Sequence, residues 1–247
     1  MKMKVGKKLF DAIVAEASRL GLLSSEHFSV DGSLIEAAAS MKSFRPKGDD
    51  DDQDGNGWAD FTGKKRSNKT HESKTDPDSR LMRKGLGKEA KLSHMLNVLD
   101  ENRNGIAVAV NVVQATGTAE REAALSLLKA TVAPRKKKAT LDADKGYDAK
   151  PSIDKLRAMN IRPHLALVNH VKRRKPPIDK RTTNSTGYKI SQVFRRKVEG
   201  IICWFKAPGR INRSRFRGTR KTNHQAQSVG AAHNLLRINN LTRIQQT

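Results

Sequence analysis

One carboxylate lies among cations on a stretch of the chain that has the pattern of an amphipathic helix. When residues 187–206 are wound at about 100° per residue, a polar stripe forms that contains Gln192, Arg195, Glu199 and Lys206. The apolar side chains of the same stretch form a neighbouring stripe that would face a core. A carboxylate in this position could hold a metal ion, and the cations beside it could contact phosphate.

Two distant aspartates extend this chemistry. Asp31 and Asp144 each follow a short segment that we interpret as a strand, so we expect both at strand ends. Magnesium prefers oxygen ligands, and two such ions can activate one oxygen and stabilise the leaving oxygen in phosphodiester chemistry. Asp31, Asp144 and Glu199 therefore suit a two-metal site. The alternative is that each acid is solvated or paired with a cation, as happens in any basic protein.

Composition points to a polyanionic partner. The 247 residues carry a formal charge of +24, far more positive charge than solubility requires. No apolar run reaches the roughly 18 residues needed to span a membrane, so we expect no membrane association. Cys203 is the single cysteine, which excludes an intrachain disulfide and a thiolate zinc site and favours a reducing compartment. We expect a cytoplasmic protein that associates with its polyanion.

Hydrophobic periodicity and turn signals predict a mixed sheet with helices on its faces. The expected elements in chain order are a helix at 7–20, a strand at 28–30, a helix at 33–43, strands at 92–99 and 106–113, a helix at 119–129 capped by Thr118, a strand at 139–144, a helix at 152–159, a strand at 163–168 and the long helix that carries Glu199. Between these elements, residues 45–75 combine acidic, glycine-rich and basic runs and are expected to form a flexible, disordered insertion.

Two clusters of cations lie outside the long helix. Lys172, Arg173 and Arg174 precede two prolines, are expected to form a basic loop and are candidate DNA contacts. The segment from 210 to 221 is rich in arginine and is expected to bind DNA. The candidate DNA contacts in it are Arg213, Arg215 and Arg217.

Several segments resemble the DDE transposases of bacterial insertion sequences, in the group that carries a Tyr-Arg-Glu-Lys signature. These segments include His-Phe-Ser-Val-Asp-Gly-Ser-Leu-Ile-Glu-Ala, Thr-His-Glu-Ser-Lys-Thr-Asp-Pro-Asp-Ser-Arg-Leu and Ala-Asp-Lys-Gly-Tyr-Asp. Arg195, Glu199 and Lys206 match the last three members of the signature at its spacing. Gln192 stands where the signature has tyrosine, and Tyr188 lies one turn earlier.

The resemblance implies an RNase H-like catalytic core. By position, Asp31 and Asp144 are similar to the two catalytic aspartates and Glu199 to the catalytic glutamate. Arg195 and Lys206 look like the DNA-contacting cations of the signature. Asp142 and Asp148 are nearby rivals of Asp144 for the second position.

The expected organisation is a helical remnant at 1–26, a catalytic core at 27–209, and a basic tail with a C-terminal helix at 210–247. The resemblance implies transposition: cutting and joining of double-stranded DNA at insertion-sequence ends and at the target, with Mg²⁺ or Mn²⁺. A homodimer is an open alternative to a monomer. Because few residues precede Asp31, the chain is also expected to be a shortened copy. The competing function is a non-catalytic nucleic-acid-binding protein, and a requirement for magnesium discriminates between the two.

Overall fold

A six-stranded mixed sheet forms the centre of the protein in a computed structural model that describes residues 5–48, 66–132, 137–167 and 178–244. The order β6-β5-β1-β7-β8 has antiparallel pairs on one side of β1 and parallel pairs on the other. The predicted mixed sheet is therefore confirmed, and its strand order resembles that of an RNase H-like fold. The strands are β1 (His27–Glu36), β4 (Arg80–Arg83), β5 (Ala90–Glu101), β6 (Ile106–Gln114), β7 (Ala139–Ala143) and β8 (Ile161–Leu165).

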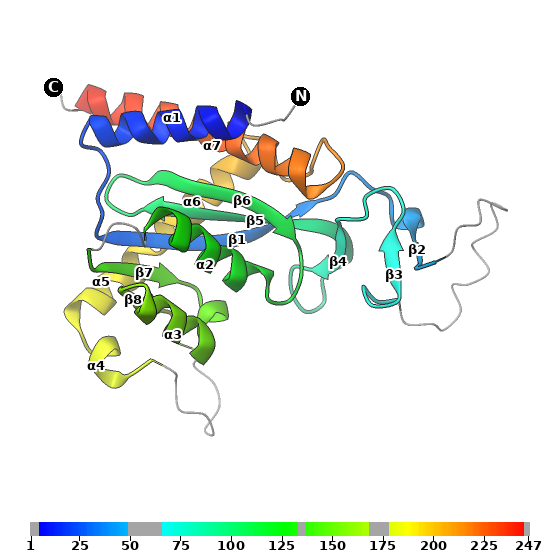
Figure 1. Cartoon of the computed structure of the whole chain (residues 1–247), viewed down its shortest axis with the longest axis horizontal. Coiled ribbons are helices and arrows are strands. Elements are labelled where there is room, and N and C mark those ends of the chain that lie inside the picture. The colour runs from blue at the N-terminus through cyan, green and yellow to red at the C-terminus, as the bar shows by residue number, and fades with distance from the viewer. Residues whose placement is uncertain (1–4, 49–65, 133–136, 168–177, 245–247) are drawn as a thin grey trace.

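Helices cover both faces of the sheet (Figure 1). Alternate residues of a strand point to opposite faces, and β1 therefore contributes to two cores. Phe28 packs in the core beneath α2 and α3, whereas Ile35 packs in the core beneath α6 and α7. The side chain of Asn234 bonds both backbone groups of Ala107 and fixes α7 on β6. The helices are α1 (Val5–Arg19), which packs on α7, α2 (Ala119–Thr131), α3 (Lys150–Ala158), α6 (Arg196–Lys206) and α7 (Thr219–Ile244).

The segment between β1 and β5, residues 37–89, departs from two expectations. Residues 33–43 were expected to be helical, but β1 continues to Glu36 and only the short 3₁₀ turn η1 (Met41–Ser43) follows. The ends of the expected flexible insertion at 45–75 form a small antiparallel sheet from β2 (Phe44–Pro46) and β3 (His71–Ser73). Residues 49–65 lie outside the described part of the chain.

Asp31 does not end its strand, contrary to expectation. The ladder between β1 and β5 runs without interruption from Phe28–Glu101 to Glu36–Ser93, and Asp31 lies in its middle. The sequence suggested a strand at 28–30 that ends at Asp31 and a helix from residue 33. Pairing with the long apolar strand β5 overrides that signal, as sheet context often overrides local propensity.

The prediction of a single long helix that carries Glu199 was also wrong. The chain forms α4 (Lys180–Thr183), α5 (Thr186–Phe194) and α6, with Arg195 at the junction of the last two. The two longer helices have different surfaces to cover. Tyr188 of α5 bonds the backbone of Leu165 at the end of β8, whereas Phe205 of α6 enters the core beneath α7.

The remaining predicted elements are confirmed to within about two residues, apart from the end of the strand expected at 163–168, which stops at Leu165. A further 3₁₀ turn, η4 (Lys145–Tyr147), follows β7. Thr118 precedes α2 as expected, but its side chain makes no capping hydrogen bond. Among the helices that the structure describes, none is long and apolar enough to cross a membrane.

Candidate active site

The sheet leaves one edge of β1 open where the predicted acids gather. Strand β7 pairs with β1 only from His27 to Val30. The other end of β1 is paired again at Glu36, whose backbone forms hydrogen bonds with the backbones of Asn212 and Ser214 at 3.0 and 2.8 Å. In the described part of the chain, no strand pairs with β1 on this side between those two contacts. Asp31 is the first residue of that open stretch.

Three elements bring the predicted acids to this edge. Asp31 lies on β1, Asp144 directly follows β7, and Glu199 lies in the first turn of α6. Burial raises the pKa of Asp31 to about 6, against the hydrogen bond from the Gly32 N–H, and the negative charges of Glu120, Asp144 and Glu199 raise it further. These three acids therefore lie near enough to Asp31 for their charges to act on it. Within the described residues, however, no three His, Cys, Asp or Glu side chains are grouped closely enough to hold a metal ion.

Both cations of the predicted stripe also lie at the open edge. The guanidinium Nη1 of Arg195 lies 3.4 Å from Oδ1 of Asp144. The ammonium of Lys206 donates to the hydroxyl of Ser33, with Nζ and Oγ 2.5 Å apart. Burial lowers the pKa of Lys206, the charge of Lys84 lowers it further, and the carboxylate of Asp31 acts in the opposite direction. Sequence reasoning gave no role to Ser33 or Lys84.

The two rivals of Asp144 have other surroundings. Asp142 is buried, and its Oδ2 accepts a hydrogen bond from Asn102 at 2.7 Å. Burial raises the pKa of Asp142 to about 6, although hydrogen bonds to Ser29 and Asn102 lower it. The charge of Asp148 acts on Tyr188 of α5. Asp144 is the half-exposed member of the three whose charge acts on Asp31.

A row of buried polar side chains lies beneath the open edge. Asp100, Ser29 and Asp142 are direct neighbours across β5, β1 and β7. Asp100 is fully buried, and neither carboxylate oxygen has a hydrogen-bonding partner within the described residues. Burial, and then the charge of Asp142, raises the pKa of Asp100 well above its usual value. Asp100 follows an apolar run and is expected from sequence to lie in a turn, so the sequence alone did not predict this row of buried polar side chains.

Glu120 is a further acid at the site that sequence reasoning treated only as part of a helix start. Its side chain lies against the backbone of Gly32, where an added Cβ would be 2.8 Å from Cγ of Glu120. A larger residue at position 32 would push Glu120 away. Burial raises the pKa of Glu120, and the charge of Asp144 contributes in the same direction.

The position of the signature tyrosine serves packing in this chain. Gln192 donates from Nε2 to the backbone oxygen of His164 at 2.7 Å, and Tyr188 donates to the backbone oxygen of Leu165 at 2.9 Å. Both side chains hold α5 against β8.

The predicted basic contacts are only partly described. Lys172, Arg173 and Arg174 lie outside the described residues. Arg213, Arg215 and Arg217 are exposed. They lie in the connection between α6 and α7, and α7 continues for 26 residues beyond it. Arg213 belongs to the segment that pairs with Glu36, so it borders the open edge of β1.

Comparison with known proteins adds a distant likeness. No protein-family model matches the chain, and no curated protein sequence is similar to it. A pre-cleavage Mos1 transpososome is 10% identical, with 95% of this chain and 60% of that chain covered at a TM-score of 0.28. A Mos1 mariner paired end complex with Mn is 10% identical, with 95% and 60% covered at a TM-score of 0.29.

The catalytic domain of Mos1 mariner transposase is 11% identical, with 96% of this chain and 89% of that chain covered at a TM-score of 0.29. The chain spans about 60% of the length of the two transposase complexes. The backbones overlap only loosely at these TM-scores.

Proposed function

We propose that the chain is a transposase that cuts and joins DNA at the ends of an insertion sequence, with Mg²⁺ or Mn²⁺ held by Asp31, Asp144 and Glu199. The observation that carries this proposal is that Asp144 and Glu199 lie near enough to Asp31, at the open edge of β1, for their charges to act on it. These acids come from three separate elements, yet the charges of Asp144 and Glu199 both raise the pKa of Asp31. Structural packing alone gives no reason to bring three acids together.

The chemistry of the donors fits a hard divalent cation. All three candidate ligands are carboxylates, and Mg²⁺ and Mn²⁺ favour oxygen donors. A divalent ion would offset the negative charges that act on Asp31. Asp144 is paired with Arg195, so metal binding requires that guanidinium to release Asp144. When bound, such an ion activates the attacking oxygen and stabilises the leaving oxygen of a phosphodiester.

The two cations supply the contacts that would hold the DNA. Lys206 is half-buried and is oriented by Ser33 at the open edge. Once Arg195 leaves Asp144, its planar group can bind two phosphate oxygens. Double-stranded DNA is therefore the proposed partner, and the formal charge of +24 adds affinity that does not depend on sequence.

A second candidate function is nucleic-acid binding without catalysis. It is favoured by one observation: the described residues contain no group of three acids or other ligands close enough to hold a metal. In that case the acids at the open edge serve only to pair with cations such as Arg195.

Magnesium discriminates between the two functions. The full chain is incubated with a supercoiled plasmid that carries the DNA flanking its gene, in Mg²⁺, Mn²⁺, Ca²⁺ or EDTA, and nicked circles are quantified. The proposal predicts nicking in Mg²⁺ and Mn²⁺, little in Ca²⁺ and none in EDTA. Equal binding of the plasmid in all four conditions, with no nicking in any, would support the non-catalytic function instead.

A further inference from the structure

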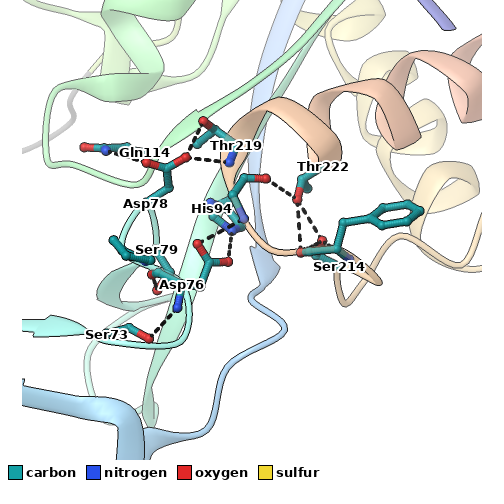
Figure 2. Close-up of polar contacts among 12 residues, drawn as sticks. Ser73, Asp76, Asp78, Ser79, His94, Gln114, Ser214, Thr219 and Thr222 are labelled. Carbon is teal, nitrogen blue, oxygen red and sulfur yellow. Dashed lines mark hydrogen bonds and ion pairs between the residues drawn. The ribbon is translucent and has the colours of Figure 1, made fainter. Parts of the chain in front are cut away.

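The segment between β1 and β5 is fastened to the start of α7 by a buried polar cluster, shown in Figure 2. Oδ2 of Asp76 lies 2.9 Å from Nε2 of His94, and both side chains are fully buried. The other oxygen of Asp76 accepts from the N–H of Gly218 at 3.1 Å. Asp78 accepts from both the N–H and the hydroxyl of Thr219 at 2.8 Å. The part of the segment that follows is therefore held in a defined position on the core.

This anchored part leads directly into a basic hairpin. Strands β4 and β5 pair up to Arg83–Ala90, and a tight turn closes them, in which the N–H of Lys88 donates to the oxygen of Gly85 at 3.2 Å. Gly87 has a φ of +75°, which the third residue of such a turn requires. Lys84 and Lys88 flank the turn.

A groove of about 320 Å³ is lined by residues of this hairpin, by the end of β1 and by Asn212. Its charged lining consists of Lys84, Lys88, Lys91, Glu36 and Glu89. Lys91 lies 3.4 Å from Glu36 and 3.9 Å from Glu89, so these three largely satisfy one another. Within the described residues, no ion pair joins Lys84 or Lys88 to a carboxylate. These two ammonium groups are therefore available to an anion.

The groove borders the far end of the open stretch of β1. Its lining includes Glu36, where that stretch ends, and Asn212, whose backbone oxygen accepts from the Glu36 N–H at 3.0 Å. The charge of Lys84 lowers the pKa of Lys206, so two like charges are held near one another. A polyanion that lay along both groups would relieve that repulsion.

We propose that this groove takes the phosphate backbone of the DNA strand that continues from the reacting phosphodiester, with Lys84 and Lys88 as its phosphate contacts. The inference rests on the proposed function, because that function places the reacting bond at Asp31. It gives the β4–β5 hairpin a role in positioning DNA.

The first test removes the two charges. Lys84→Ala/Lys88→Ala is compared with the full parent chain in titrations of a labelled 30-base-pair duplex at several salt concentrations. The slope of log affinity against log salt should become shallower by about 2, since each phosphate contact contributes about 0.9. The matched control is Lys8→Ala/Lys129→Ala, which removes two exposed lysines on other surfaces, α1 and the end of α2. The inference is overturned if both double variants give the same slope as each other.

The second test locates the strand. Leu86 is fully exposed at the tip of the hairpin, and Leu86→Cys in a Cys203→Ser background carries a single thiol for a photoactivated cross-linker. On a duplex with one defined nick, cross-links should concentrate on nucleotides to one side of the nick. Cross-links spread evenly along the duplex would contradict the inference.

The two tests separate this inference from the proposed function. Suppose that the parent chain nicks DNA in magnesium and that Lys84→Ala/Lys88→Ala binds and nicks as the parent does. The proposed DNA contact in the groove is then overturned, while the proposed function stands. If the parent chain never nicks, but the double variant loses the salt slope and the cross-links keep their position, the groove stands as a DNA contact and the catalytic function fails.

Discussion

The guanidinium of Arg195 lies 3.4 Å from the carboxylate of Asp144. One residue is a predicted DNA contact and the other a predicted metal ligand, so the same pair joins both functions of the site. Arg195 supplies positive charge to Asp144 in the state described here. A metal ion and a DNA phosphate would separate the pair, each taking one partner.

Replacing Arg195 should therefore strengthen metal binding and weaken DNA binding. In Arg195→Gln, the affinity for Mn²⁺ without DNA should rise by a factor of about 5, which corresponds to the loss of an ion pair worth about 1 kcal/mol. Free Mn²⁺ is measured by electron paramagnetic resonance. Arg196→Gln removes an exposed neighbouring cation and serves as the control. Unchanged Mn²⁺ affinity in Arg195→Gln would mean that Asp144 is not a ligand.

Lys206 should contribute one phosphate contact. Lys206→Met keeps most of the apolar stem but removes the ammonium that bonds Ser33. The slope of log DNA affinity against log salt should become shallower by about 0.9, while Lys129→Met should leave the slope unchanged. Equal slopes for the two variants would mean that Lys206 does not contact phosphate and has only a structural role beside Ser33.

The burial of Asp100 predicts that replacing it with Asn raises stability at high pH. Because burial raises the pKa of Asp100 in the folded chain, the folded state holds a proton that the unfolded state has released, and stability falls as pH rises from about 4. Asp100→Asn carries no such penalty. Its Tm should match that of the parent near pH 4 and exceed it by roughly 2–4 °C at pH 8, the shift that about 1 kcal/mol produces in a chain of this size.

The comparison is made by thermal unfolding of both proteins across that pH range. A lower Tm for Asp100→Asn at pH 8 would show that the Asp100 carboxylate has a stabilising partner. Asp142→Asn is a poor control because burial also raises the pKa of Asp142, so the exposed acid Glu122, changed to Gln, is used instead.

Asp78 should stabilise α7 from outside the helix. It bonds both the N–H and the hydroxyl of Thr219 at the helix start, which is the role of a capping residue. Asp78→Ala should lower the free energy of unfolding by about 1 kcal/mol, and Asp78→Asn should lose less because its amide oxygen can still accept. Chemical denaturation measures both. Equal losses in the two variants would indicate that charge, not the cap, is what matters.

The sequence predicted the elements whose patterns are local. The β-branched run at 106–113 forms β6, and the acidic first turn at Glu120 begins α2. The sequence-based predictions failed where tertiary contacts determine the ends of an element. The strand expected at 28–30 was to end at Asp31, but nine residues of pairing with β5 extend β1 to Glu36. The periodicity around Glu199 is continuous, yet Arg195 divides it because α5 and α6 cover different parts of the sheet.

The candidate site was predicted in part for the same reason. Spacing suggested Arg195, Glu199 and Lys206, since they follow one helical period. The contacts of Lys206 with Ser33, and of Asp76 with His94, join residues far apart in the chain. No periodic pattern connects such residues, so their partners become visible only when the sheet is assembled.

The most direct test of the central claim is metal-dependent nicking by charge-neutral variants of the proposed ligands. Glu199→Gln and Asp144→Asn keep the shape of each side chain but remove the charge that would hold the metal. Both should abolish nicking of the plasmid in Mg²⁺ while leaving DNA affinity nearly intact, and Glu122→Gln, an exposed acid on α2, should nick as the parent does. If Glu199→Gln and Asp144→Asn nick as fast as the parent chain, these carboxylates do not hold a catalytic metal and the proposed function is wrong.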